Sequence, residues 1–139
     1  MFSPLPDRFL PHAQALLRIL AGLGFFTHGA QKLFGWFGAT GTVSITSIYG
    51  AAGVIETVAG LMIAAGLLTR LAAFFAAGEM AVAYFWVHAM GGGLFWWSNQ
   101  GELAMLYAAI FLAFAAWGPG PFSLDAVRRP RTVERSGDR

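Results

Sequence analysis

The sequence has no cysteine and little charge. The absence of cysteine among its 139 residues excludes disulfide exchange, thiolate metal ligands and cysteine nucleophiles. Charged residues make up 12% of the chain, against roughly 25% in soluble domains, and hydrophobic residues make up 57%. No cleavable signal peptide is expected, because the first apolar segment is long, contains Arg18 and follows Asp7. The composition predicts an integral membrane protein.

Long apolar segments separated by glycine-rich breaks predict four membrane-spanning helices. One helix over residues 45–90 would be about 69 Å long, more than twice the ~30 Å hydrocarbon core of a bilayer. The chain must therefore turn within 66–70, where we expect Gly66 to end one helix and Thr69 to cap the next. Ser44 or Thr46 is expected to cap the helix before this turn. The predicted helices cover residues 13–34, 45–68, 70–90 and 101–117.

We interpret residues 1–127 as one domain, an all-α integral membrane four-helix bundle with up-down-up-down topology. The remaining residues, 128–139, form a basic tail that we expect to be disordered. A basic tail after apolar helices is better explained by membrane topology than by nucleic-acid binding, so we expect a lipid bilayer as partner and no nucleic acid.

The distribution of basic residues predicts the orientation. Four spans place both termini and the 66–70 turn on one side, together with every basic residue except Lys32 if Arg18 snorkels to that surface. The positive-inside rule then predicts both termini in the cytoplasm of a bacterial inner membrane. The two glycine-aromatic loops, residues 35–44 and 91–100, would lie outside.

Ionisable side chains within the predicted spans are costly in a bilayer and therefore mark candidate sites. His28, Gln31 and Lys32 share one helix face near the outer end of the first span, because the latter two lie three and four positions after the histidine. Glu56 and Glu79 lie at a common depth, about 16 Å from the outer ends of their helices. Because all four helices bring polar groups to the outer half, we expect a shared site there. The ligand-binding candidates are His28, Gln31, Lys32, Trp36, Glu56, Glu79, His88, Trp97, Asn99 and Glu102.

Structural roles compete with ligand binding for most of these residues. Glu56 and Glu79 could pair with each other or with Lys32 or Arg18 and so fix helix packing. His28 could bond to a carbonyl of a neighbouring helix. The choice between structural and functional roles stays open from sequence alone.

The aromatic and histidine candidates carry their own alternatives. Trp36 and Trp97 fit the aromatic belt at a membrane surface, and Trp86 fits helix packing. Glu79 and His88 are half a turn out of phase on an ideal helix, so they share a site only if the helix is kinked or bent. His88, at a helix end, fits a solvated position.

Metal and haem are disfavoured as cofactors. Carboxylate-bridged metal sites in helix bundles use Glu-x-x-His spacing, which neither Glu56 nor Glu79 has. Axial haem ligation by His28 and His88 is disfavoured because both lie outside the midplane of the bundle. A quinone is the cofactor that remains under consideration.

Two segments carry specific motifs: LLRILAGLGFFTHGAQKLFGWFG at 16–38 and GELAMLYAAIFLAFAAWGPGPFSLDA at 101–126, with Glu56 in a glycine-rich helix between them. From about residue 16 to 126 the chain resembles the DoxX family of small bacterial membrane proteins. The resemblance implies a four-helix inner-membrane protein. It also implies kinship with a subunit of an archaeal thiosulfate:quinone oxidoreductase and with a component of a membrane oxidoreductase complex. It places no catalytic mechanism on these residues.

Three functions remain open. In the first, the protein is a quinone-linked redox subunit: His28 or Lys32 bonds a quinone carbonyl, Trp36 or Trp97 stacks on the ring, and the two glutamates relay protons. Its electrons would come from a membrane or periplasmic oxidoreductase partner, so whether the chain is itself an enzyme stays open. In the second, the protein is a non-catalytic anchor or assembly subunit. In the third, which we rank last, a homo-oligomer forms a small-solute or proton pathway.

Overall fold

The computed structural model describes residues 6–128, and this part of the chain is entirely helical, with no strand. The predicted tail therefore lies outside the described residues, apart from Arg128. The structure confirms the predicted all-α bundle. Its elements are a short 3-10 helix η1 (Asp7–Phe9), α1 (Leu10–Phe34), α2 (Ile48–Ala65), α3 (Thr69–Val82), a π-helix η2 (Ala83–Ala89), α4 (Met90–Gly92), α5 (Trp96–Asn99), α6 (Glu102–Trp117) and α7 (Leu124–Arg128).

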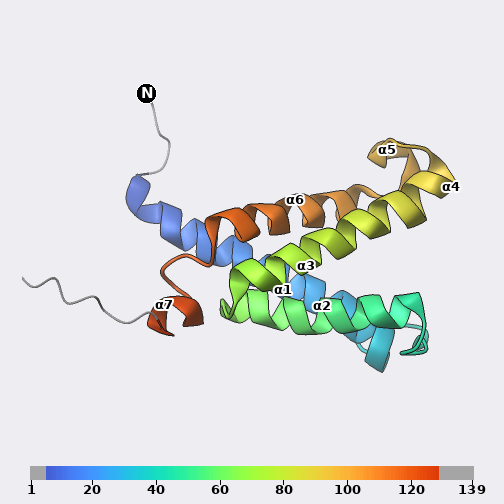
Figure 1. Ribbon diagram of the computed structural model, residues 1–139, viewed down its shortest axis with the longest axis horizontal. Coiled ribbons are helices and arrows are strands. Elements are labelled where there is room, and N and C mark those ends of the chain that lie inside the picture. The colour runs from blue at the N-terminus through green and yellow to red at the C-terminus, as the bar shows by residue number, and fades with distance from the viewer. Residues whose placement is uncertain (1–5, 129–139) are drawn as a thin grey trace, which may run out of the picture.

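Two antiparallel helix pairs build the bundle (Figure 1). Helix α1 packs along α2, and α3 packs along α6. The pairs meet at the end that carries the α2–α3 turn and α7, and they spread apart toward the end that carries α4 and α5 (Figure 1). We call these the closed end and the open end.

Glycine allows α1 and α2 to approach closely. A Cβ atom on Gly29 would lie 2.5 Å from the backbone nitrogen of Thr57, and one on Gly60 would lie 2.6 Å from that of Phe26. Only a residue without a side chain fits at such distances. This is the small-residue packing typical of membrane helices, where close backbone approach replaces the hydrophobic effect.

The exterior of the bundle suits lipid. Within residues 6–128, three stretches are long and apolar enough to cross a membrane, namely 7–34, 48–65 and 69–92, and α6 is a shorter apolar helix. Large hydrophobic side chains such as Leu20 and Phe74 are exposed, whereas Phe25, Phe111 and Phe114 are fully buried at the centre. In a bilayer the exposed apolar side chains would contact acyl chains.

Two arginines tie the helix ends together at the closed end. Arg18 is 1% exposed, and its guanidinium donates to the carbonyl oxygens of Ile63 and Ala64, each at 2.8 Å, and to that of Phe122. The expected snorkelling to the surface is therefore wrong, because the carbonyls at the end of α2 satisfy the charge inside the protein. Arg70 donates in the same way to the last carbonyls of α6.

The C-terminal segment caps α3. Gly66 ends α2 in the left-handed conformation, as expected. Thr69 is the first residue of α3 rather than its cap, and Asp125 performs the capping, with its two carboxylate oxygens accepting from the amides of Leu68 and Thr69 at 2.8 and 2.9 Å. Burial acts to raise the pKa of the Asp125 carboxyl, but these hydrogen bonds outweigh it and the pKa falls below its ordinary value. At α2 the cap is Ser47.

The π-helix η2 changes the phase of the third span. Nine residues of ideal α-helix make 2.5 turns, which would set Glu79 and His88 on opposite faces. Over Ala83–Ala89 the chain winds more slowly, with i→i+5 bonding, so the nine residues from Glu79 to His88 complete fewer than 2.5 turns. The π-helix thus supplies the departure from ideal α-helix that a shared site requires, and both residues line the cavity between the helix pairs.

Candidate functional site

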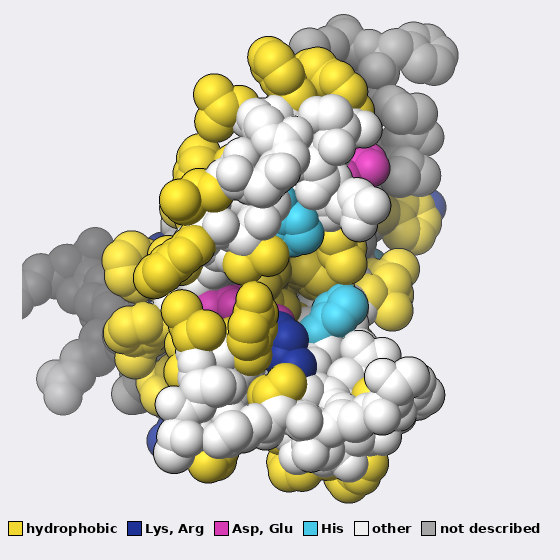
Figure 2. Space-filling model, turned by 90° about the vertical axis from the view of Figure 1, so that its right-hand side faces the viewer, with side chains coloured by type: hydrophobic (Ala, Val, Ile, Leu, Met, Phe, Trp, Pro, Cys, Tyr) yellow, Lys and Arg dark blue, Asp and Glu magenta, His cyan; other side chains and the backbone are white. Residues whose placement is uncertain are grey.

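A cavity of about 940 Å³ lies between the two helix pairs at the open end. Its walls come from α1, α2, α3, η2 and α6, and they are mostly apolar. Seen from the open end, the molecule is hollowed at its middle, and histidine, basic and acidic side chains gather in this hollow (Figure 2). The volume falls in the range of small-molecule sites, about 300–1,000 Å³.

An ion pair lies in the cavity wall formed by α1 and α2. Lys32 Nζ is 2.6 Å from Glu56 Oε1, and the two side chains are 30% and 2% exposed. The close packing of α1 on α2 brings them together, since Gly53 lies against the Lys32 side chain one turn before Glu56. The second carboxylate oxygen of Glu56 is buried and has no hydrogen-bond partner within residues 6–128.

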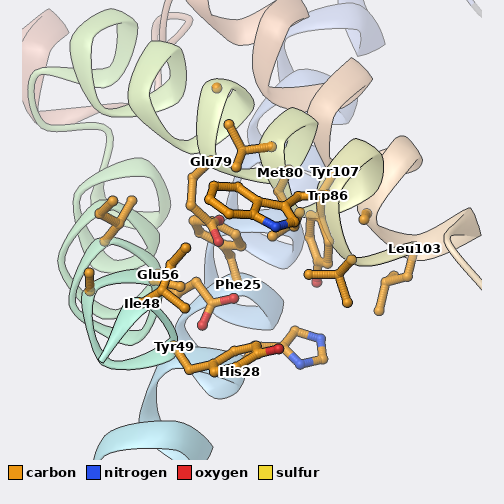
Figure 3. Close-up of a pocket in the computed structure, with 18 of the residues that line it drawn as sticks. Phe25, His28, Ile48, Tyr49, Glu56, Glu79, Met80, Trp86, Leu103 and Tyr107 are labelled. Atoms are coloured by element: carbon orange, nitrogen blue, oxygen red, sulfur yellow. The ribbon is translucent and has the colours of Figure 1, made fainter. Parts of the chain in front are cut away.

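A second carboxyl group enters from the other helix pair. Glu79, on α3, points into the same space as Glu56 (Figure 3). Its Oε2 is also buried and lacks a partner in the described part of the chain. Buried polar atoms are normally hydrogen-bonded, so two orphaned carboxyl oxygens in one cavity indicate a place where a ligand or water completes the bonding.

Two of the three histidines belong to the cavity wall. The His28 ring meets the Tyr107 ring edge-on, with their centroids 6.0 Å apart. His88, carried by η2, lies with Nδ1 3.2 Å from the carbonyl oxygen of Asn99. Both line the cavity. The α1 and η2 segments thus supply one imidazole each.

Aromatic rings cover the cavity walls. Trp86, Phe25 and Tyr107 lie around the two carboxyl groups, and Tyr49 also lines the cavity (Figure 3). Sequence reasoning missed Tyr107 and assigned Trp86 to packing. A hydroxyl in the middle of an apolar span was the available signal for Tyr107, because a polar group in a bilayer needs a partner.

Half of the predicted site residues meet at the cavity. These are His28, Lys32, Glu56, Glu79 and His88. The structure therefore brings together these five ionisable groups from the first three spans, and their role as ligand contacts stays a prediction.

The other five predicted residues lie outside the cavity lining and have local roles. Gln31 donates to the carbonyl of Phe37 at 3.2 Å, and Asn99 donates to that of Gly93 and accepts from the amide of Gly101. The remaining three are exposed: Trp36 packs on Phe34, Trp97 stacks on Phe95, and Glu102 lies in the first turn of α6.

The residues that line the cavity limit the kind of ligand it can hold. Within residues 6–128, no three His, Cys, Asp or Glu side chains are placed to hold a metal ion together. The cavity offers apolar and aromatic walls, one ammonium, two carboxyl groups and two imidazoles. This combination can bind an amphipathic molecule from the lipid and exchange hydrogen bonds or protons with its head.

Comparison with known proteins places the chain among membrane proteins. The family model described as DoxX matches residues 13–89. A protein of Haemophilus influenzae, described as uncharacterized, is 38% identical over 125 residues, which cover 86% of this chain and 92% of the relative. An uncharacterized membrane protein of Mycobacterium tuberculosis is 34% identical over 133 residues, covering 83% of this chain and 80% of the relative. No solved structure matches the chain significantly.

Proposed function

The chain belongs to the DoxX family of membrane proteins, and from this premise we propose that it binds a lipid-soluble quinone in the cavity as a quinone-linked component of a membrane oxidoreductase system. The observation that carries the proposal is the cavity itself. It combines apolar and aromatic walls with ionisable groups at a depth where ions are costly and therefore usually functional.

In this proposal each cavity residue makes a different contact with the quinone. The ring of the quinone stacks on Trp86, which takes the role that the sequence assigned to Trp36 or Trp97. His28 or Lys32 donates a hydrogen bond to a ring oxygen, and Glu79 exchanges a proton with it. A partner protein exchanges the electrons with the bound ring.

The orientation belongs to the same proposal. The closed end carries Arg18 and Arg70, and the open end carries Lys32, so the positive-inside rule puts the closed end in the cytoplasm of a bacterial inner membrane. The cavity then opens in the outer half of the bilayer.

The cysteine-free chain allows a direct test of this orientation with single cysteines. In intact cells an impermeant maleimide should label Trp97→Cys and leave Val127→Cys unlabelled until the membrane is permeabilised. The reverse pattern would overturn the orientation.

Ligand binding is tested by filling the cavity. Gly78 lines the cavity, and a Cβ built on it meets no atom within 4 Å, so a larger side chain fits there without disturbing the helix. The protein would be placed in lipid nanodiscs, and its affinity for decylubiquinone measured by calorimetric titration. We expect Gly78→Phe to weaken binding by about tenfold or more, because its ring occupies the ligand volume.

The matched control is the same substitution at a glycine outside the cavity. Gly91 also has open space around its built Cβ, but it lies in α4 and does not line the cavity. Gly91→Phe should bind decylubiquinone as the unchanged protein does. The proposal fails if the unchanged protein does not bind the quinone, or if both glycine variants bind it equally well.

A further inference from the structure

The orphaned atoms of the cavity are all of one kind. Of the four buried side-chain atoms that lack a hydrogen-bond partner in the described chain, two belong to residues that line the cavity, Glu56 Oε2 and Glu79 Oε2. The other two, Arg18 Nε and Thr69 Oγ1, belong to residues at the closed end. Each orphaned polar atom carries a desolvation cost that a complementary ligand atom would remove.

Carboxyl oxygens limit what that ligand atom can be. An ionised carboxylate only accepts hydrogen bonds. A quinone presents two carbonyl oxygens, which also only accept, so a quinone oxygen facing Glu79 leaves both oxygens unpaired. A hydroquinone presents two hydroxyl groups, each with one proton to donate. The reduced ring therefore satisfies a carboxylate that the oxidised ring cannot.

We infer that the cavity binds the hydroquinone form of its ligand more tightly than the quinone form, with Glu79 as the residue that makes the distinction. The inference rests on the proposed quinone-linked function and names the redox form that the site favours. In this arrangement one ring hydroxyl donates to the Glu79 carboxylate while the ring lies against Trp86. Both side chains come from the third span and border the same space (Figure 3).

Glu79 is better suited to this role than Glu56. Glu56 is engaged through its Oε1 with the Lys32 ammonium, and it is held within the tightly packed α1–α2 pair. Glu79 comes from the opposite helix pair, is half-buried, and makes no hydrogen bond to other described residues through its side chain. A ligand can therefore bond to Glu79 without breaking an existing interaction.

The test compares two redox forms of one probe. Nanodiscs containing the full chain would be titrated under anaerobic conditions with decylubiquinone and with its reduced form, decylubiquinol. At alkaline pH, where the Glu79 carboxyl is ionised, a hydrogen bond to this charged acceptor predicts that decylubiquinol binds about ten- to a hundredfold more tightly. Glu79→Gln supplies an amide that donates as well as accepts, so the ratio of the two dissociation constants should fall to about one to three.

Matched variants separate this effect from misfolding. Glu79→Gln removes no side-chain hydrogen bond within the described residues, so the variant should keep its elution profile and thermal transition. Glu102→Gln makes the same chemical change at an exposed position outside the cavity and should keep the full discrimination. Weaker binding of decylubiquinol without weaker binding of decylubiquinone points to the hydroxyl contact, because a packing defect would weaken both probes together.

Each outcome bears on a distinct statement. If neither redox form binds, the proposed quinone-linked function fails, and the inference fails with it. If both forms bind equally, or if Glu79→Gln preserves the preference, quinone binding stands and the inference is overturned. Decylamine serves as a third probe. If it binds more tightly than decylubiquinol and depends on Glu79, the carboxylate recognises a cation, and the hydroquinone assignment is again overturned.

Discussion

Replacing Lys32 by methionine would leave the Glu56 carboxylate buried without its counterion. The ammonium lies 2.6 Å from Glu56 Oε1, and the Glu56 side chain is only 2% exposed, so water replaces little of the lost interaction. Removing one partner of a buried ion pair typically costs about 3–5 kcal/mol. Because Lys32 itself is 30% exposed, part of its charge is already solvated, and we expect a loss near the lower value, about 3 kcal/mol.

Removing both charges should restore most of this loss. In the double variant Lys32→Met with Glu56→Met, no unpaired charge remains in the protein, and the expected free energy of unfolding lies within about 1–2 kcal/mol of the unchanged protein. The coupling energy between the two sites should therefore be at least about 1 kcal/mol, to which any loss caused by Glu56→Met alone is added. Unfolding by SDS in mixed micelles, followed by tryptophan fluorescence, measures all four proteins of the cycle.

Two results would refute this reasoning. A loss below about 1 kcal/mol for Lys32→Met would mean that Glu56 does not depend on the ammonium. A double variant whose loss equals the sum of the single losses would mean that the residues act independently. Arg8→Met is the control for losing a positive charge at an exposed position, and it should change stability by no more than about 0.5 kcal/mol.

The remaining predictions concern the closed end and the α1–α2 contact. Arg18→Lys should cost about 2 kcal/mol or more in SDS unfolding, because a single ammonium cannot reach all the carbonyls that the guanidinium bridges. Gly29→Ala should destabilise by about 1–3 kcal/mol in the same assay, since its Cβ clashes with α2, whereas Gly78→Ala should be neutral or stabilising. The Asp125 pKa is lowered on folding, so its contribution is complete above about pH 4 and is lost as pH falls through the folded pKa. Asp125→Asn should therefore flatten the loss of melting temperature between pH 5 and 3, values set by that ordinary carboxyl pKa of about 4.

Sequence could predict the helices because the membrane makes their signal strong. Apolar runs of spanning length and glycine breaks set the number of helices and the turn at Gly66. The residues that cap the helix ends were harder to predict, since a cap depends on which side chain reaches the free backbone amides at that end. Thr69 was the local candidate, but Asp125 caps α3 from far along the chain. Nothing in the local sequence around Thr69 indicates that long-range contact.

The site residues were predicted from their depth along the spans, but depth does not show which way a side chain points. His28, Lys32 and Glu56 line the cavity, since a charge within a span has few options besides the bundle interior, and their role as ligand contacts stays a prediction. Asn99 and Gln31 had alternatives, and their side chains bond to nearby loop carbonyls instead. A residue next to a loop finds local partners, so polarity at the right depth overestimates the site.

The two motifs that carry the family resemblance act at opposite ends of the molecule. The HGxQKLFG segment supplies His28 and Lys32 to the cavity at the open end. The GPGxxSLD segment docks at the closed end, where Phe122 accepts from Arg18 and Asp125 caps α3. The second motif joins the helix pairs at the closed end, and the first motif supplies charged and ionisable side chains at the open end. Substitutions in the second motif should therefore act on stability, and ligand binding should respond mainly to substitutions in the first.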